Sequence, residues 1–276
     1  MAGVADAAHL PPATSLCSPR TARSAVPTIA SSLLAAAFLV AVDARAEDQK
    51  PDTPRITAIA PLDVVRGQDT TLRIRGVKLS GETEVRFSAA LKVEIKEKKA
   101  AEIPNGLVAK DVGDTQLEVK LTVPGDLPAG PLALSVVTPE GTTAARELRV
   151  LDAANCVDEK EPNGSLREAQ PIELGKTLRG TIKEDKDVDV FQFTGKSGQR
   201  VAAEVFAARG ASLLDSVLTL LDAHGHQLAC ADDSLSRDSQ LTLTLPADGP
   251  YFLIVQDAHD RGGPWHSYEL TVKESP

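Results

Sequence analysis

Apolar and polar residues alternate along most of the chain beyond residue 54. In the first half, apolar side chains recur at every second position in five short segments, at 72–74, 93–95, 117–121, 132–136 and 148–150. In the second half, the segment 241–245 reads LTLTL and has the clearest period of two. Because successive side chains of a β-strand point to opposite faces of a sheet, each segment is predicted to be a strand with one buried face.

Turn residues divide the second half into further strands. These are predicted at 178–182, 188–193, 200–207, 216–221, 227–231, 239–245, 251–257 and 267–273. Gly and Pro turns recur at intervals of about ten residues, which is typical of β-sandwiches. The alternation lapses between residues 151 and 160, and no long amphipathic helix is predicted. We therefore predict an all-β fold with two β-sandwich domains, over residues 53–152 and 156–273.

A different pattern precedes the strands. Two arginines stand before an apolar run of 14 residues, 29–42, and small residues suited to cleavage end at Ala46. This arrangement predicts a secretory signal peptide over residues 1–46, followed by a polar linker at 47–52. The alternative is an uncleaved N-terminal anchor, although a membrane-spanning helix needs about 20 residues. We expect the protein to be secreted, periplasmic or on the cell surface, with no stable transmembrane span after cleavage.

The charge of the chain narrows the range of partners. There are 30 Lys and Arg residues against 39 Asp and Glu, a formal net charge of −9. Residues 153–276 hold 12 of the basic and 20 of the acidic residues, so the acidic excess lies in the second predicted domain. Such a field attracts cations and repels nucleic-acid phosphates. We therefore predict no nucleic acid partner.

The first predicted domain opens on a motif. Residues 54–61 read PRITAIAP, and Gly67, 70–76 (TTLRIRG) and 84–87 (EVRF) follow. This order, within residues 53–152, resembles an IPT/TIG domain. The resemblance implies an immunoglobulin-like fold.

The second predicted domain carries a longer series of motifs. They are Glu159-Lys160-Glu161-Pro162-Asn163, then Gly180, 187–191 (DVDVF), 221–225 (LDAHG), 232–234 (DDS) and 245–251 (LPADGPY). In this order they resemble the bacterial pre-peptidase C-terminal domain. That family comprises accessory β-sandwiches appended to secreted proteases and other exported proteins. The number of predicted strands agrees with a jelly-roll-like sandwich.

The resemblance also implies a calcium site, because the Glu-x-Glu-Pro-Asn segment and nearby aspartates supply Ca²⁺ ligands in that family. The matching positions are Glu159, Glu161, Asn163 and Asp189, with Asp187 and then Asp185 as additions. Ca²⁺ takes six to eight oxygen ligands, so an oxygen-only set suits it. Two positions depart from the family pattern: Gly164 offers no side-chain oxygen, and Lys186 stands among the aspartates. The alternative is that these side chains cap turns by accepting hydrogen bonds from backbone amides.

Cysteines and histidines leave further alternatives. Cys156 and Cys230 are the two cysteines beyond the signal peptide and are a disulfide candidate, with two unpaired thiols as the alternative. The histidines beyond the signal peptide, in or beside predicted hairpin loops, are His224, His226, His259 and His266. A His-x-His pair suits Zn²⁺. No sequence feature brings the loops together, so we predict surface histidines.

No motif of a known catalytic site occurs, neither Gly-x-Ser-x-Gly nor His-Glu-x-x-His. We predict an exported, non-catalytic binding or accessory protein that engages an extracellular protein or polysaccharide, with Ca²⁺ as a stabilising ion. One alternative is an accessory or chaperone-like subunit of a separate secreted peptidase. Another is a structural protein of the cell envelope.

Overall fold

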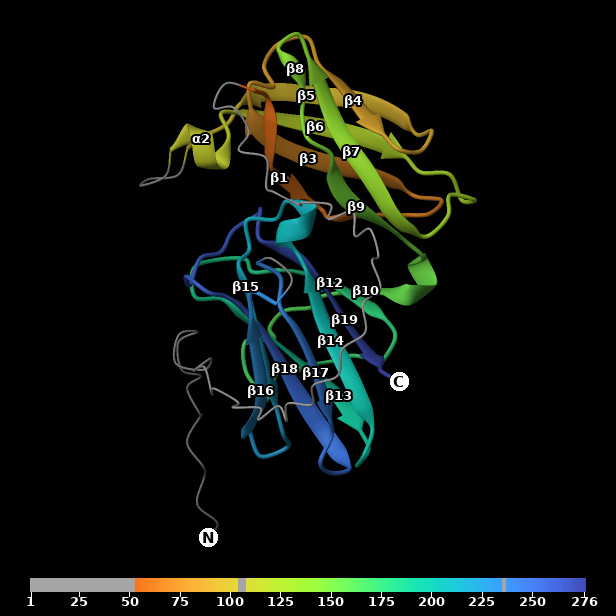
Figure 1. The fold of residues 1–276 in the computed structure, drawn as a ribbon, viewed down its shortest axis with the longest axis vertical. Coiled ribbons are helices and arrows are strands. Elements are labelled where there is room, and N and C mark those ends of the chain that lie inside the picture. Colours follow the sequence, from red (N-terminus) through yellow and green to blue (C-terminus); the bar gives the residue numbers. More distant parts are fainter. Residues whose placement is uncertain (1–52, 104–107, 235–236) are drawn as a thin grey trace, which may run out of the picture.

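The computed structural model describes residues 53–103, 108–234 and 237–276. The predicted signal peptide and linker, which together are residues 1–52, lie outside these ranges. The described residues form β-strands with only short helices, which confirms the predicted all-β fold class (Figure 1). No helix in these three ranges has the length and apolar character needed to cross a membrane.

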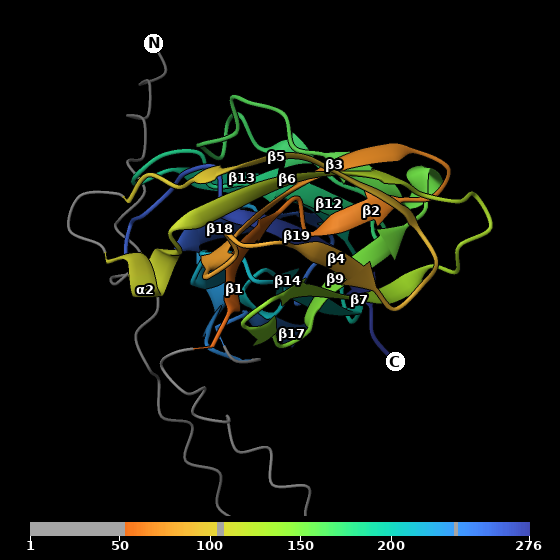
Figure 2. The same ribbon diagram turned by 90° about the horizontal axis from the view of Figure 1, so that it is seen from above.

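The first half of the described chain forms two sheets with a shared core. One sheet, in spatial order, consists of β1 Arg55–Ala60, β3 Asp69–Val77, β6 Thr115–Thr122 and β5 Lys92–Ala100. The other consists of β2 Asp63–Val65, β9 Arg146–Leu151, β7 Gly130–Thr138 and β4 Glu84–Phe87, with β8 Gly141–Thr142 paired to β7. A short helix, α2 Ala109–Val112, precedes β6. Figure 2 shows β3, β5 and β6 on one side and β4, β7 and β9 on the other.

Strand β6 illustrates why the alternation predicted the fold. Leu117, Val119 and Leu121 are fully buried, whereas the polar residues between them are only half-buried. The three side chains share one core cluster with Leu72 of β3 and Leu134 of β7. Because burying each such side chain stabilises the fold by about 1.5–3 kcal/mol, one face of the strand is fixed toward the opposite sheet.

The second half forms another pair of sheets. One consists, in spatial order, of β10 Cys156–Asp158, β12 Thr177–Thr181, β19 Ser267–Glu274, β14 Arg200–Phe206 and β17 Gln240–Thr244. The other consists of β11 Gln170–Pro171, β13 Val188–Gly195, β18 Gly249–Asp257, β15 Ser216–Leu221 and β16 Gln227–Asp232. The strands predicted here from the sequence correspond to β12 through β19. Strands β10 and β11 are too short to show an alternation, so the sequence pattern missed them.

The two sandwiches lie end to end in Figure 1 and share buried contacts. Ala58 and Ala60 of β1 form an apolar cluster with Trp265, which precedes β19 and is 8% exposed. The backbone N–H of Ile59 donates to the carbonyl of Ala211 over 2.9 Å, between the two sandwiches. Trp265 therefore packs as part of the junction between the sandwiches.

The predicted Cys156–Cys230 disulfide is wrong, because Cys156 is a free thiol in the part of the chain that the structure describes. Cys156 begins β10, at one edge of its sheet. Cys230 lies on β16, which contacts β17 at the opposite edge of that sheet. The width of the sandwich therefore separates the two residues.

Candidate metal centre

Backbone pairing places the Glu-x-Glu-Pro-Asn segment between the two sheets of the second sandwich. After β10, the N–H of Glu159 continues the ladder by donating to the Arg179 carbonyl over 2.9 Å. The carbonyl of Asn163 then accepts from the N–H of Val190 on β13, also over 2.9 Å. The segment thus crosses from β12 to β13, and its side chains meet Asp189, the residue before Val190.

Three carboxylates converge here. Ligand oxygens of Glu159, Glu161 and Asp189 all lie within 4.8 Å of one another. Glu159 Oε2 accepts the N–H of Thr181 over 2.7 Å, and Asp189 Oδ2 accepts the Tyr268 hydroxyl over 2.5 Å. The structure therefore brings together three of the acidic residues that the sequence indicated.

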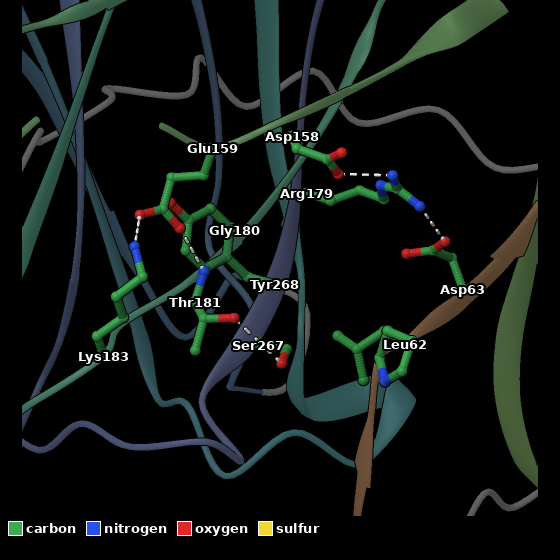
Figure 3. A pocket seen from close by; sticks show the side chains of 11 residues that line it. Leu62, Asp63, Asp158, Glu159, Arg179, Gly180, Thr181, Lys183, Ser267 and Tyr268 are labelled. Atoms are coloured by element: carbon green, nitrogen blue, oxygen red, sulfur yellow. Dashed lines mark hydrogen bonds and ion pairs between the residues drawn. The ribbon is translucent and has the colours of Figure 1, made fainter. Parts of the chain in front are cut away.

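Lys183 supplies a positive charge at this cluster. Its Nζ lies 2.8 Å from Glu159 Oε1 and 2.8 Å from Glu161 Oε1 (Figure 3 shows the first contact). The sequence pattern indicated Lys186 as the lysine among the aspartates. The backbone N–H of Lys186 donates to the Asp260 carbonyl instead. Lys183 follows the end of β12 and belongs to no motif, so no sequence signal indicated it.

Asp187 and Asp185 have other partners. Asp187 accepts backbone N–H groups from Lys183, over 2.6 Å, and from Val188, over 2.9 Å. Asp185 accepts the N–H of Gly262 over 3.1 Å. Both side chains thus hydrogen bond to backbone amides, as the turn-capping alternative expects.

Two buried side chains retain unused oxygens at this site. Asn163 and Asp189 are fully buried, and neither Asn163 Oδ1 nor Asp189 Oδ1 has a hydrogen-bond partner among the described residues. A buried polar atom without a partner costs about 1–3 kcal/mol. A cation coordinated by these oxygens and by the neighbouring carboxylates would remove that cost. The residues present therefore fit a hard, oxygen-loving cation.

The electrostatics agree with a cation-binding role. Burial, and then the charge of Glu159, raises the pKa of Asp189 to about 8. Hydrogen bonding to Lys183 lowers the pKa of Glu161. Burial favours the neutral amine of Lys183, but its hydrogen bonds to Glu159 and Glu161 outweigh that effect and raise its pKa. The single ammonium group of Lys183 therefore does not supply enough positive charge to keep all three carboxyl groups ionised at neutral pH.

A cavity of about 380 Å³ adjoins the cluster, at the junction of the two sandwiches (Figure 3). Leu62 and Asp63 line it from the first sandwich, and Glu159, Arg179 and Tyr268 from the second. Arg179 connects the two sandwiches, because its guanidinium contacts Asp158 over 2.5 Å and Asp63 over 3.1 Å. Glu159 thus faces both the carboxylate cluster and the junction.

Gly180 is required by the packing at this cavity. It lies directly opposite Tyr268 in the β12–β19 ladder, and a Cβ at Gly180 would overlap the Tyr268 ring. The glycine lets the ring lie over the strand and direct its hydroxyl to Asp189.

The family comparison matches this half of the molecule. Residues 187–257, from the residue before β13 to the end of β18, match the model of the bacterial pre-peptidase C-terminal domain. These residues of the second sandwich are a pre-peptidase C-terminal domain. This confirms the family that the sequence motifs resembled. The likeness of the first sandwich to an IPT/TIG domain stays a prediction.

Known proteins resemble this chain over different lengths. A probable subtilase-type serine protease of Deinococcus radiodurans is 48% identical over 109 residues, which are 38% of this chain and 15% of that protein. The chain thus matches only a small part of that relative. The pre-peptidase C-terminal domain of a collagenase from Bacillus anthracis is 22% identical and has a TM-score of 0.33, covering 42% of this chain and all of that structure. A Bacteroides ovatus glucan-utilisation protein, SGBP-B, in complex with a mixed-linkage heptasaccharide, is 12% identical with a TM-score of 0.28, covering 81% of this chain and 75% of that one.

Proposed function

We propose that this chain is an exported, non-catalytic accessory protein whose pre-peptidase C-terminal domain engages an extracellular protein or polysaccharide. The observation that carries the proposal is the 48% identity to a segment making up 15% of a probable protease. The matching 109 residues are a minor part of that relative, which is consistent with a module that is separate from its catalytic machinery. The buried cluster of Ala58, Ala60 and Trp265 joins the two sandwiches. This contact supports a binding surface to which both sandwiches contribute.

We propose further that Ca²⁺ binds to Glu159, Glu161, Asn163 and Asp189. The unpartnered oxygens of Asn163 and Asp189 support this ligand set. The ion would offset the charge of the carboxylates and hold the segment after β10 against β13. Because Glu159 also lines the cavity between the sandwiches, the bound ion would stiffen their junction.

Thermal melts of residues 47–276, with millimolar Ca²⁺ or with EGTA, test the calcium proposal. A ligand that binds only the native state must raise the melting temperature. We expect Asn163→Ala to abolish this rise, whereas Asp126→Asn, at an exposed position of the first sandwich, retains it. A wild-type melting temperature that does not respond to Ca²⁺ would contradict the proposal.

The partner is tested by retention of the same chain on immobilised polysaccharides and on secreted proteins of the producing cell. Saturable retention on either supports the binding role. The relationship to a protease segment also favours a second candidate, an accessory subunit of a separate secreted peptidase. Co-purification of an active peptidase from the exported fraction would support that candidate, and fractionation with insoluble wall material would support a structural envelope role.

A further inference from the structure

The hairpin between β15 and β16 holds a second group of metal-ligating side chains. Asp222 directly follows β15, and His224 and His226 complete the turn. Asp222 Oδ1 accepts the backbone N–H of His224 over 2.8 Å and that of His226 over 2.9 Å. Gly225 takes a φ of +80°, which glycine adopts without strain. The turn is therefore fixed by its own backbone contacts.

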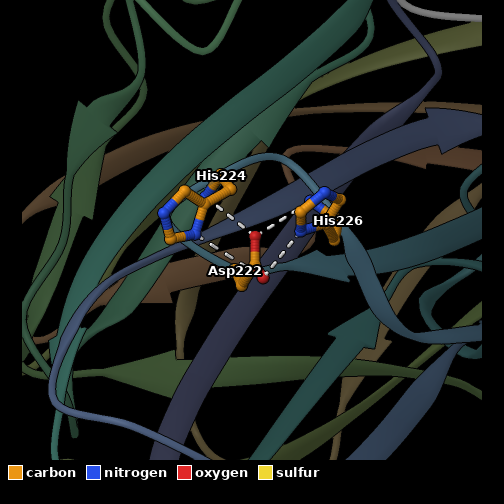
Figure 4. A group of neighbouring side chains, drawn as sticks. All are labelled: Asp222, His224 and His226. Atoms are coloured by element: carbon orange, nitrogen blue, oxygen red, sulfur yellow. Dashed lines mark hydrogen bonds and ion pairs between the residues drawn. The ribbon is translucent and has the colours of Figure 1, made fainter.

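The second oxygen of Asp222 faces both imidazoles (Figure 4). Asp222 Oδ2 lies 3.2 Å from His226 Nδ1 and 4.0 Å from His224 Nδ1. The two rings are stacked, with 5.9 Å between their centroids. Oδ1 alone accepts both turn amides, so the hydrogen bond between His226 Nδ1 and Asp222 Oδ2, over 3.2 Å, is additional to the backbone contacts that close the hairpin.

These donor distances suit a small divalent metal ion. A tetrahedral ion with bonds of about 2.0–2.1 Å separates its ligand atoms by about 3.3 Å. The His226 nitrogen already has this separation from Oδ2, and His224 needs only a small rotation. That rotation is unhindered, because the His224 and His226 side chains are 79% and 77% exposed.

We propose that Asp222, His224 and His226 form a surface site for Zn²⁺. Imidazole nitrogens select zinc and similar transition metals, whereas Ca²⁺ takes oxygen ligands. The site therefore differs in chemistry from the carboxylate cluster of Glu159, Glu161 and Asp189. Three protein ligands leave a fourth position open to solvent, where water or a donor atom of another molecule completes the coordination. The hairpin lies at the end of the second sandwich away from the first, so that position is accessible (Figure 1).

Calorimetric titration of tag-free residues 47–276 with Zn²⁺ tests the site. We expect one saturable ion per chain, and a loss of affinity of more than about tenfold in His224→Ala and in His226→Ala. The control is His259→Ala, which removes another exposed histidine, whose Nδ1 lies 3.6 Å from Asp215 Oδ2 and which has no second histidine two positions away. Visible absorption of bound Co²⁺ provides an independent readout of imidazole coordination.

Two outcomes would overturn the proposal: no saturable Zn²⁺ binding by the wild type, or unchanged affinity in the His224→Ala/His226→Ala double variant. Both histidines are exposed, so unchanged thermal melts of the metal-free variants will show that they fold. Asn163→Ala should keep its Zn²⁺ affinity. The Zn²⁺ titration of Asn163→Ala separates the two proposals, because the zinc site can be absent while the calcium site is present, and the reverse.

Discussion

The guanidinium of Arg149, in the first sandwich, stacks on the ring of Phe206, in the second, with 4.0 Å between Arg149 Cζ and the ring centroid. The same guanidinium lies 3.4 Å from Glu269 Oε2 and 3.5 Å from Glu204 Oε1. A planar guanidinium can stack and donate hydrogen bonds at once. One side chain of β9 thus contacts both β14 and β19 across the junction.

Replacing this side chain should weaken the whole protein. We expect Arg149→Ala to lower the free energy of unfolding by about 1–2 kcal/mol, through the lost stacking and hydrogen bonding. Urea unfolding measures the change. The control is Arg86→Ala, which removes a side chain that is 58% exposed and that, among the described residues, forms an ion pair with Glu84 alone. Equal effects of the two substitutions would contradict a stabilising role for the Arg149 contacts.

The buried Glu269 predicts an unusual dependence of stability on pH. Burial, and then the charge of Asp63, raises its pKa from 4.5 to about 8. Between these values the folded chain keeps a proton that the unfolded chain releases, so stability falls as the pH rises. The slope from this group is at most about 1.4 kcal/mol per pH unit. Asp189, whose pKa is also about 8, contributes with the same sign.

Urea unfolding from about pH 5 to about pH 8 checks this dependence. We expect Glu269→Gln to flatten the curve and to be more stable than the wild type near pH 8, because the amide needs no buried charge. Glu274→Gln, at an exposed position of the same strand, should leave the slope unchanged. The explanation fails if wild-type stability rises with pH across this window.

Lys183 should compete with the proposed calcium ion. In Lys183→Gln, Glu159 and Glu161 lose their shared cation. Because the Lys183 side chain is 50% exposed, the cost without Ca²⁺ should be only about 1 kcal/mol or less. The rise in melting temperature on adding Ca²⁺ should exceed that of the wild type. A rise identical to that of Lys196→Gln, which changes an exposed lysine, would exclude competition by Lys183.

Gly180 should not tolerate a side chain. An added Cβ would overlap the ring of Tyr268, which is 1% exposed and cannot move freely. We expect Gly180→Ala to destabilise the protein by about 1–3 kcal/mol. Gly164→Ala is the control, because a Cβ there would meet only the Val188 carbonyl oxygen, at an ordinary 3.6 Å. Similar unfolding curves for the two variants would contradict the packing role of Gly180.

The sequence by itself determined the longer strands, β12 through β19, and the family of the second sandwich. Alternation is a local property, and a strand such as β6 can bury only one set of its side chains. The motifs around Glu159 and Asp189 were likewise readable, because they lie in short continuous segments whose order identified the domain.

Only the tertiary structure decided which side chains meet. Strand order places Lys183 against Glu159 and Glu161, and it separates Cys156 from Cys230. A turn conformation aims His224 and His226, which are exposed as the sequence predicted, at one carboxylate oxygen of Asp222. His266, also predicted to lie at the surface, is buried instead. Such contacts depend on strand pairing and turn geometry, and neither is encoded in the period of the apolar pattern.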